Sequence, residues 1–572
     1  MQKVKDEVVL VGEVIYTYHV VGGEVEVGAL QNEDVVKDFI HGKRTMRSAI
    51  DYSRGGRLVI PAKLGGKKVT RIGAYAFFDC KNLTSVVIPK GVKAIGEGAF
   101  DGCVSLKSVT IPEGVERIDH YAFKGCKSLK VVKLPKSVRK LGRGVFEWCR
   151  SLESVTIPRG VTLINGWAFD GCANLKTVKI PESVTNILSD AFGWCRSLEE
   201  VKIPKGVTWI GDGVFMGCRK LKSITIPKSL REIEDSTFGF CPGLKSITIP
   251  KNIEVINSGA FYNNCLKEIL VDEENKKFCS VDGVLFSKDK KDLLCYPGGR
   301  KGEYEIPQGV TFIGERAFGG CKALTSVVIP DSVTIIGWDA FAECSNLAAV
   351  TIPESVSGIA SFAFSKCKKL TSVRIPAGVD GIGCGAFSGA NIQEFVVDEG
   401  NKWYCARDGV LFTKDGTRLV AYPCGREGVY EVPSVVIEIG QDAFRDAKLS
   451  GVTMPDSVKT IELDGFAGCK NLTTLVIPDS VSSLGTYAFV GCSNLTSVTM
   501  SKNITRLDDE AFPRCKRLAE VRFMGLPPRV QELEVPRKMV GYYLPKYEKE
   551  WEAVLDAKGR WQGIEMKMSA AE

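Results

Sequence analysis

Short segments in which apolar and variable residues alternate recur along most of this chain. Residues 83–89 read LTSVVIP, and Leu83, Val86 and Ile88 are the apolar positions that recur in the later copies. Alternation with a period of two predicts a short strand with one face in a core. Pro89 has no N–H to donate, so it ends the hydrogen-bond ladder of that strand. Each copy therefore predicts one short, half-buried strand.

The rest of each copy predicts a turn-rich return of the chain. Residues 96–103 read GEGAFDGC, and their glycines oppose a long helix. We therefore expect a short irregular or 3₁₀ segment. The expected inward positions after the strand are Val92, Ile95, Ala99, Phe100 and Cys103.

These segments form a repeat of constant length. Cysteine occurs at 80, 103, 126, 149, 172, 195, 218 and 241, at intervals of 23 residues. A constant period of this size is typical of a solenoid whose units bury their apolar faces against each other. The expected fold is a repeat solenoid of 23-residue units with about 20 coils and a column of core phenylalanines. That column comprises Phe100, Phe123, Phe146, Phe169, Phe192, Phe215, Phe238, Phe261, Phe318, Phe341, Phe364, Phe387, Phe444, Phe466, Phe489 and Phe512.

Fifteen of the 20 cysteines occupy one repeat position. Stacked coils bring these cysteines near disulfide distance, but their parallel Cβ directions suit the bond poorly. We expect a column of buried thiols that pack as small apolar groups. Off this column, pairing of Cys279 with Cys295 and of Cys405 with Cys424 stays open as an alternative. The column comprises the eight cysteines above with Cys265, Cys321, Cys344, Cys367, Cys469, Cys492 and Cys515.

The pattern L-x-x-V-x-I-P-x-x-V-x-x-I-G-x-x-A-F-x-G-C resembles the BspA-like, Treponema-type class of leucine-rich repeats over about residues 58–523. The resemblance implies a leucine-rich repeat array with a parallel sheet on its concave side and irregular or short 3₁₀ segments on its convex side. It also implies adhesion and protein binding at microbial surfaces. Repeat type predicts architecture better than it predicts a partner.

The expected domains are an N-terminal cap (1–57), the solenoid (58–523) and a C-terminal cap (524–572). Two inserts, near 272–302 and 398–428, each contain DGVLF, a Lys-Asp turn and a segment ending in Tyr-Pro, so each predicts a hairpin. In the C-terminal cap, Tyr547, Trp551, Val554 and Leu555 have helical spacing, and Gly559 is placed to end that helix.

Charge and hydropathy narrow the function classes. Lys and Arg number 76 against 68 Asp and Glu, and this net charge of +8 gives no argument for nucleic acid or an anionic membrane. No apolar run is long enough to span a bilayer. The first 20 residues lack the pattern of a signal peptide, which favours the cytoplasm unless a leader is missing. The family resemblance favours the cell surface or secretion, so localisation stays open.

The residues do not assemble a recognisable catalytic, cofactor or metal site. Only His19, His41 and His120 are present, and their positions suggest no base beside a nucleophile. The cysteines are never in C-x-x-C pairs, which disfavours zinc. Acidic turns near 272–274 and 398–399 lack the alternating oxygen ligands of a calcium loop. We therefore expect a protein that is not an enzyme and has no cofactor.

The outward positions of the predicted strands are the main candidates for binding. They are small, polar and mildly basic, which suits a protein or glycan but also simply keeps a sheet soluble. Trp148, Trp194 and Phe240 form a second group at 46-residue spacing, with Gly171 and Gly217 at the intervening copies. This alternation of large and small residues favours packing over stacking on sugar rings. The candidate partner-binding residues are Thr110, Lys133, Thr156, Lys179, Lys202, Thr225, Trp148 and Trp194.

These features predict a non-catalytic scaffold for protein interaction or adhesion, which binds a partner over the concave sheet and the inserted hairpins. The alternative is a carbohydrate or extracellular-matrix adhesin that uses the edge aromatics and the inserts. A protein is the expected partner and a glycan the second choice, with no nucleic acid and no membrane span. The oligomeric state stays open.

Overall fold

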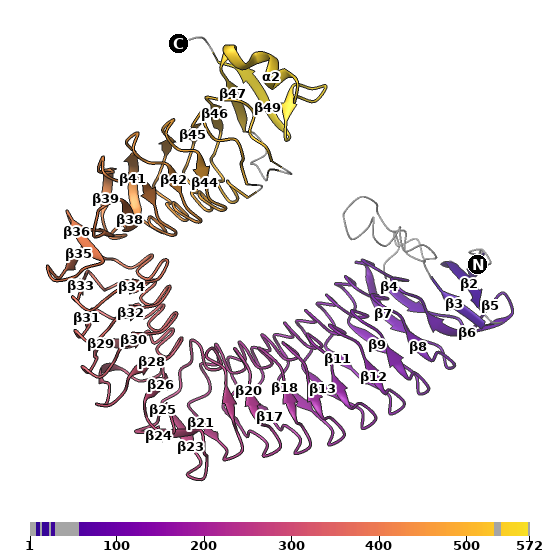
Figure 1. Cartoon of the computed structure of the whole chain (residues 1–572). Helices are drawn as coiled ribbons and strands as arrows, with labels where there is room; N and C mark the ends of the chain where they lie inside the picture. The colour runs from indigo at the N-terminus through magenta and orange to yellow at the C-terminus, as the bar shows by residue number, and fades with distance from the viewer. Residues whose placement is uncertain are drawn as a thin grey trace. The chain divides into compact units, whose positions relative to one another are not determined.

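The computed structural model describes residues 7–11, 14–21, 24–28, 56–508, 510–530, 533 and 539–569. The chain winds as a β-solenoid of about 22 turns with parallel sheets, which confirms the expected repeat solenoid (Figure 1). It divides into two compact units, Met1–Lys288 (unit 1) and Asp289–Glu572 (unit 2). His41 lies outside the described residues, and so does the side chain of His19.

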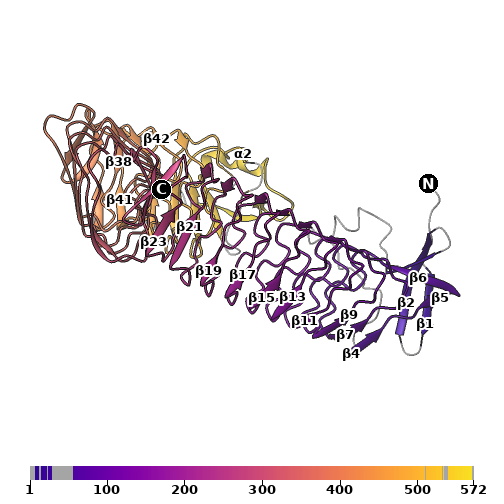
Figure 2. The same ribbon diagram turned by 90° about the horizontal axis from the view of Figure 1, so that it is seen from below.

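The alternating segments of unit 1 form a ladder of short parallel strands, one per coil. Ser108 pairs with Val131, and Ser154 with Thr177, in successive coils. Figure 2 shows these strands as a row. The ladder consists of β4 (Gly56–Val59), β7 (Leu83–Val87), β9 (Ser108–Thr110), β11 (Val131–Val132), β13 (Ser154–Thr156), β15 (Thr177–Lys179), β17 (Glu200–Val201), β19 (Ser223–Ile224), β21 (Ser246–Ile249) and β23 (Glu268–Val271).

A second parallel ladder runs through unit 1, and the alternation of residues does not reveal it. After β6, each coil contributes only two residues, such as Ala94 and Ile95, which pair with Arg117 and Ile118. Two residues are too few to show a period. The strands are β6 (Lys67–Ile72), β8 (Ala94–Ile95), β10 (Arg117–Ile118), β12 (Lys140–Leu141), β14 (Leu163–Ile164), β16 (Asn186–Ile187), β18 (Trp209–Ile210), β20 (Glu232–Ile233) and β22 (Val255–Ile256).

The N-terminal strands of unit 1 join this second ladder. β1 (Glu7–Val11) and β2 (Val14–Val21) are antiparallel, and β2 pairs with β3 (Glu24–Val27). β3 then lies parallel to β6, which also pairs with the short strand β5 (Lys63–Leu64). The first complete coil is therefore flanked by an antiparallel sheet.

Unit 2 repeats the two ladders. The first consists of β27 (Gly302–Glu305), β29 (Leu324–Val328), β31 (Ala349–Thr351), β33 (Ser372–Ile375), β35 (Glu394–Val397), β39 (Glu427–Glu431), β41 (Lys448–Thr453), β43 (Thr474–Val476), β45 (Ser497–Met500), β46 (Glu520–Phe523), β47 (Val540–Tyr543) and β49 (Ile564–Met568). The second consists of β26 (Asp292–Cys295), β28 (Phe312–Ile313), β30 (Ile335–Ile336), β32 (Gly358–Ile359), β34 (Gly381–Ile382), β38 (Arg418–Ala421), β40 (Glu438–Ile439), β42 (Thr460–Ile461) and β44 (Ser483–Leu484).

The glycine-rich segments between the ladders are irregular, as expected. The Phe77 N–H donates to Ala99 O of the next coil at 2.7 Å, and the Phe100 N–H donates to Ala122 O at 2.8 Å. Left-handed residues such as Gly98 (φ 55°) interrupt any helical run. No 3₁₀ helix forms between residues 56 and 508, all of which are described. These turns therefore form hydrogen bonds both within a coil, as from the Asp101 N–H to Gly98 O at 3.0 Å, and from coil to coil.

The core is built from the predicted columns. The ring centroids of successive phenylalanines from Phe77 to Phe261 lie 5.0 to 6.1 Å apart, with nearly parallel planes. In unit 2, Tyr296 and Tyr422 extend the column, at 5.0 and 5.2 Å from the next phenylalanine ring. Stacked aromatic rings are stabilising beyond the area that they bury. The prediction that this column is core is confirmed.

The two inserts form antiparallel hairpins around Asp-Gly turns. β24 (Phe278–Val281) pairs with β25 (Val284–Ser287), and β36 (Tyr404–Arg407) pairs with β37 (Val410–Thr413). Asp282 and Gly283 both have positive φ, 46° and 72°, as a tight hairpin turn requires. The DGVLF segment thus begins with a turn. The central residues of β25 and β37 are buried, so these strands belong to the core.

The C-terminal segment closes unit 2 with a shorter helix than predicted. A 3₁₀ turn, η1 (Pro545–Tyr547), leads into α2 (Glu548–Glu552), and β48 (Arg560–Trp561) pairs with β49. The buried Trp551 donates from Nε1 to Gly525 O at 3.0 Å. The helix stops before Val554, which is exposed, and Asp556 then accepts the Lys558 and Arg560 N–H groups in a turn. In the described part of the chain, no helix is long and apolar enough to span a bilayer.

Candidate functional site

Six of the predicted binding residues lie on the first ladder of unit 1. We call Thr110, Lys133, Thr156, Lys179, Lys202 and Thr225 the ladder surface, and all six are exposed. The alternation explains this, because Val109, Val155 and Val178 between them point into the core. Thr156 is the register partner of Lys179 in the next coil. The six side chains therefore follow one row from coil to coil.

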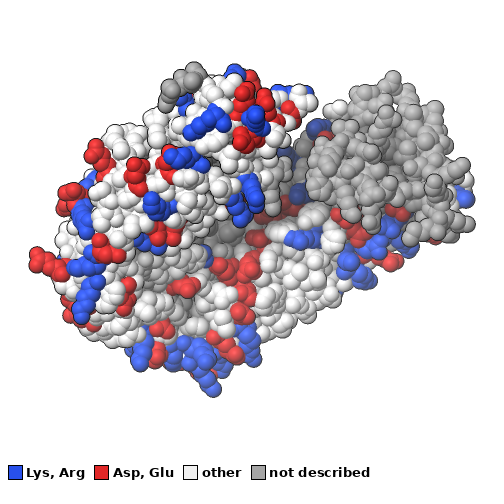
Figure 3. Space-filling view, turned by 45° about the horizontal axis from the view of Figure 1, so that its top comes forward, with Lys and Arg blue, Asp and Glu red and all other residues white. Residues whose placement is uncertain are grey.

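The ladder surface is basic in its middle. Lys133, Lys179 and Lys202 lie on or just after β11, β15 and β17. Lys202 Nζ is 3.8 Å from Glu182 Oε1, and both side chains are largely exposed, so this ion pair is weak. Val131, on the same surface, is 59% exposed. Elsewhere, acidic and basic side chains are interspersed on the face seen in Figure 3.

The other two predicted residues, Trp148 and Trp194, lie apart from the ladder surface in the glycine-rich turns. A Cβ atom added at Gly171 would lie 2.6 Å from Cε3 of Trp148, and one at Gly217 would lie 2.6 Å from Cε3 of Trp194. Each indole therefore covers the glycine of the next coil. This confirms the predicted packing of large against small residues.

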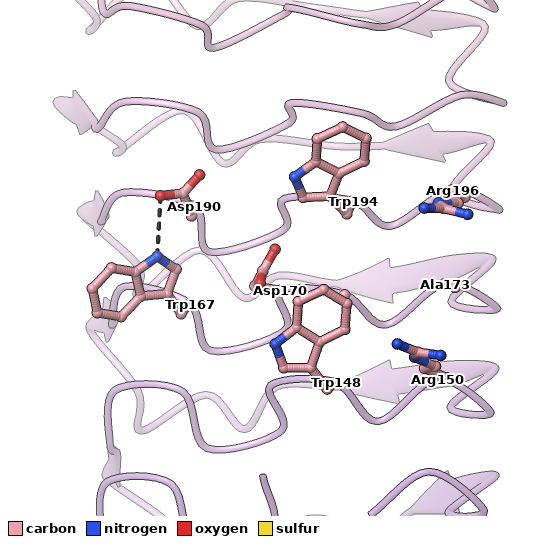
Figure 4. Close-up of a pocket in the computed structure, with 9 residues that line it drawn as sticks. Trp148, Arg150, Trp167, Asp170, Ala173, Asp190, Trp194 and Arg196 are labelled. Carbon is pink, nitrogen blue, oxygen red and sulfur yellow. Dashed lines mark hydrogen bonds between the residues drawn. The ribbon is translucent and has the colours of Figure 1, made fainter. Parts of the chain in front are cut away.

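A hollow of about 510 Å³ opens between these two indoles, as Figure 4 shows. Trp167, from the coil between them, lies at one side, where its Nε1 donates to Asp190 Oδ2 at 3.1 Å. Arg150 and Arg196 lie at the other side, with Cζ 5.3 Å from the Trp148 ring centroid and 5.9 Å from that of Trp194. A hollow of this size is in the range of small-ligand pockets.

Asp170 lies in the wall of this hollow and is only 9% exposed. Its Oδ1 atom is buried and accepts no hydrogen bond. Burial, with the nearby carboxylates of Asp190 and Glu147, raises the pKa of Asp170 to about 7. The hollow thus combines aromatic faces, two guanidinium groups and a carboxyl group that is partly protonated near neutral pH.

Of the residues that line the hollow, the sequence predicted Trp148 and Trp194 as binding residues. It did not predict Trp167, Asp170, Asp190, Arg150 and Arg196. One signal was available, because the tripeptide Trp-Cys-Arg occurs at both 148–150 and 194–196. Trp167 occupies a different repeat position, so the 46-residue spacing does not include it.

The candidate catalytic and metal-binding residues that the structure describes lie apart from one another. His120 is exposed, and its Nδ1 accepts the Arg143 N–H at 2.8 Å. Asp272 and Asp398 each accept a backbone N–H two residues later, so both are turn residues. Within the described ranges, His, Cys, Asp and Glu side chains nowhere gather in threes as a metal site requires.

The cysteine column is a hydrogen-bonded part of the core. All its members are buried except Cys265, which is partly exposed. Sγ of Cys126 donates to Phe100 O at 3.2 Å, and Sγ of Cys172 donates to Phe146 O at 3.2 Å. The thiols therefore also satisfy backbone carbonyls. In the inserts, Cys405 donates to Thr413 O and Cys424 to Arg445 O, and neither forms a disulfide.

Native protein should protect the column from alkylation. Burial raises the pKa of the Cys172 thiol well above its ordinary value, and the thiolate is the reactive form. We expect maleimide to modify Cys172 at pH 8 at least about 100-fold more slowly than the half-buried Cys405, and to modify both alike in denaturant. Mass spectrometry of timed samples measures both rates. Equal native rates would contradict a closed core.

The repeats match the family described as BspA type leucine-rich repeat region over residues 65–176, 164–281, 301–403 and 428–532. The chain belongs to this family. The predicted resemblance is thereby confirmed. BspA-type repeats are typical of protein-binding or surface-adhesion scaffolds, and leucine-rich repeat solenoids are generally non-catalytic. A search of the curated proteins found no match.

Solved leucine-rich repeat structures are also similar to this BspA-type chain. A leucine-rich repeat protein from Bacteroides ovatus is 20% identical, with 98% of this chain and 100% of that chain covered and a TM-score of 0.38. The leucine-rich repeat protein of T. pallidum is 30% identical over 36% of this chain and 87% of its own, with a TM-score of 0.30. The pneumococcal vaccine antigen PcpA is 17% identical over 99% of both chains, with a TM-score of 0.35.

Proposed function

We propose that this protein is a non-catalytic scaffold whose ladder surface binds an acidic protein partner. The observation that carries this is the row of six exposed side chains on consecutive coils, with Lys133, Lys179 and Lys202 at its middle. A rigid row of small polar residues with a few cations can contact a partner across many coils, and complementary charge speeds and orients such an encounter.

We propose a smaller part in binding for the inserts than for the ladder surface. The central residues of β25 and β37 are buried. Trp403, in the second insert, is 45% exposed and is the largest apolar side chain that this insert offers to a partner. The proposal therefore assigns binding to the ladder of unit 1.

The experiment first places a photo-crosslinking residue at Thr156 of the full chain, with Thr208 as the matched exposed position off the ladder surface. Protein that crosslinks at Thr156 and not at Thr208 is identified and purified. Its affinity is then measured for a variant with Lys133, Lys179 and Lys202 changed to alanine.

We expect the triple variant to bind the partner about tenfold more weakly, mainly through slower association, and to lose most of the salt dependence. The control changes Lys136, Lys205 and Lys228 to alanine, which removes the same charge from exposed positions past the strand prolines. Equal weakening by both variants would show that only net charge matters and would contradict a specific ladder site.

A further inference from the structure

The two tryptophans of the hollow have the same orientation. At Gly171, an added Cβ would lie 2.6, 2.9 and 3.1 Å from Cε3, Cδ2 and Cζ3 of Trp148, and at Gly217 the distances to the same atoms of Trp194 are identical. The six-membered part of each indole therefore covers a glycine, which leaves the opposite face of each ring outward. Figure 4 shows the two rings side by side along the stack, separated by the coil of Trp167. Two coils correspond to about 10 Å.

The backbone at both tryptophans is left-handed, as it is at the same repeat position of other coils, where Asp79, Phe240 and Glu343 have φ of 57°, 56° and 60°. Trp148 and Trp194 have φ of 59° and 54°, whereas the neighbouring coils place Gly125, Gly171 and Gly217 at the same repeat position. A left-handed conformation is rare for a bulky residue and costs backbone energy that glycine avoids. Packing alone does not require tryptophan at a position where glycine also completes the coil.

The hollow between the rings is lined by one buried carboxyl group and two guanidinium groups. Asp170 is more than nine-tenths buried, its Oδ1 accepts no hydrogen bond, and its carboxyl group lies between the two indoles in Figure 4. Arg150 is exposed beside Trp148, and Arg196 is exposed beside Trp194. The ligand should therefore offer flat apolar faces, hydroxyl groups for Asp170 and no positive charge, because two guanidinium groups already line the hollow.

We propose that the hollow between Trp148 and Trp194 binds a linear chain of β-linked pyranose sugars, with one sugar ring stacked on each indole and the sugar between them hydrogen-bonded to Asp170. The C–H faces of a pyranose fit an aromatic ring, and alternate units of a β-linked chain can meet two rings that are two coils apart. Arg150 and Arg196 favour a chain that carries carboxylate groups. This site lies outside the ladder surface and does not depend on the proposed protein binding.

The test is calorimetric titration of the full chain with two probes, a hexamer of β-1,4-linked glucose and a hexamer of β-1,4-linked mannuronic acid. We expect binding at micromolar to millimolar concentrations, and at least tenfold weaker binding by Trp148→Gly and by Trp194→Gly. Glycine is native at this position in the adjacent coils, so both variants should keep the fold. Asp170→Asn, which preserves shape, should weaken binding several-fold. Thermal unfolding of each variant verifies the fold.

The control is Trp209→Asn, since Trp209 is 39% exposed on β18 and the preceding coil has Asn186 at that position. It should leave saccharide binding unchanged, as should the triple lysine variant of the ladder surface. Tighter binding of the mannuronic acid hexamer assigns a role to Arg150 and Arg196, and equal binding supports stacking without them. The proposal is overturned if neither hexamer binds or if binding survives both tryptophan variants.

Discussion

Replacing Asn401 by alanine should lower the free energy of unfolding of unit 2 by about 3–5 kcal/mol. Asn401 is 1% exposed, and its side chain makes four hydrogen bonds. Nδ2 donates to Pro376 O at 2.8 Å and to Val379 O at 2.9 Å. Oδ1 accepts the N–H groups of Trp403 and Tyr404 at 2.9 and 2.8 Å. Alanine removes all four bonds, and of the four backbone groups Pro376 O keeps another donor, the Val379 N–H at 3.3 Å.

The magnitude follows from the number of buried groups that lose a partner. Each unsatisfied buried backbone group costs about 1–3 kcal/mol, and relaxation or water recovers part of the sum. The loss of stability should at first be confined to the coils around residue 401, because a solenoid coil contacts only its neighbours. Hydrogen exchange at the Trp403 and Tyr404 amides should accelerate by a factor of about 100 or more, and urea unfolding should begin earlier.

Asn346→Ala is the matched control in the same unit. Asn346 is exposed in part, and its Nδ2 makes one bond, to Lys322 O at 2.7 Å. Its loss should cost about 1 kcal/mol or less. Asn275 of unit 1 holds its insert by the same four-bond arrangement, so Asn275→Ala should reproduce the Asn401 result in unit 1. If Asn401→Ala and Asn346→Ala were equally mild, the asparagine would not be what anchors the insert.

The repeat period predicts most of the fold because each column follows from one repeat position. Phe100 and Cys103 are buried, and so are the residues at the same repeat positions in later coils. The exposure of Thr156 and Lys179 follows from the alternation alone. The period does not predict the role of Asn401, because this asparagine stands among polar residues in an insert. Its burial is evident only once the carbonyls of Pro376 and Val379 are known to converge on it.

The hollow could be predicted only in part, for a similar reason. The 46-residue spacing singles out Trp148 and Trp194 but gives no direction for their rings. Asp170 belongs to the coil between them, and its unpartnered oxygen depends on which N–H groups the turn has already used. One example is the Gly171 N–H, which donates to Gly193 O at 2.9 Å. The spacing of residues does not predict whether a backbone N–H bonds within its own coil or to the next coil.

Asp170→Asn should make unit 1 more stable than wild type by about 2 kcal/mol at pH 8 and leave its stability unchanged near pH 4. The pKa of Asp170 is raised from an ordinary 3.8 to about 7, first by burial and then by the charges of Asp190 and Glu147, while the Gly171 N–H and the charge of Lys124 oppose the shift. The folded state therefore holds a proton that the unfolded state releases above pH 4. Stability from this group is fully present below about pH 4 and is lost as the pH rises to about 7.

A shift of this size corresponds to about 4 kcal/mol at most, and screening by water in the open hollow reduces it to about 2 kcal/mol. Thermal unfolding between pH 4 and pH 8 measures the difference. Burial also raises the pKa of Asp101, to about 6. The stability of the Asp170→Asn variant should therefore still depend somewhat on pH. The exposed Asp212 is the control, and Asp212→Asn should change stability by less than about 0.5 kcal/mol. If the variant and the wild type had the same stability at every pH, Asp170 would already be ionised and solvated. The hollow would then lack the buried carboxyl group that is proposed to bind the saccharide.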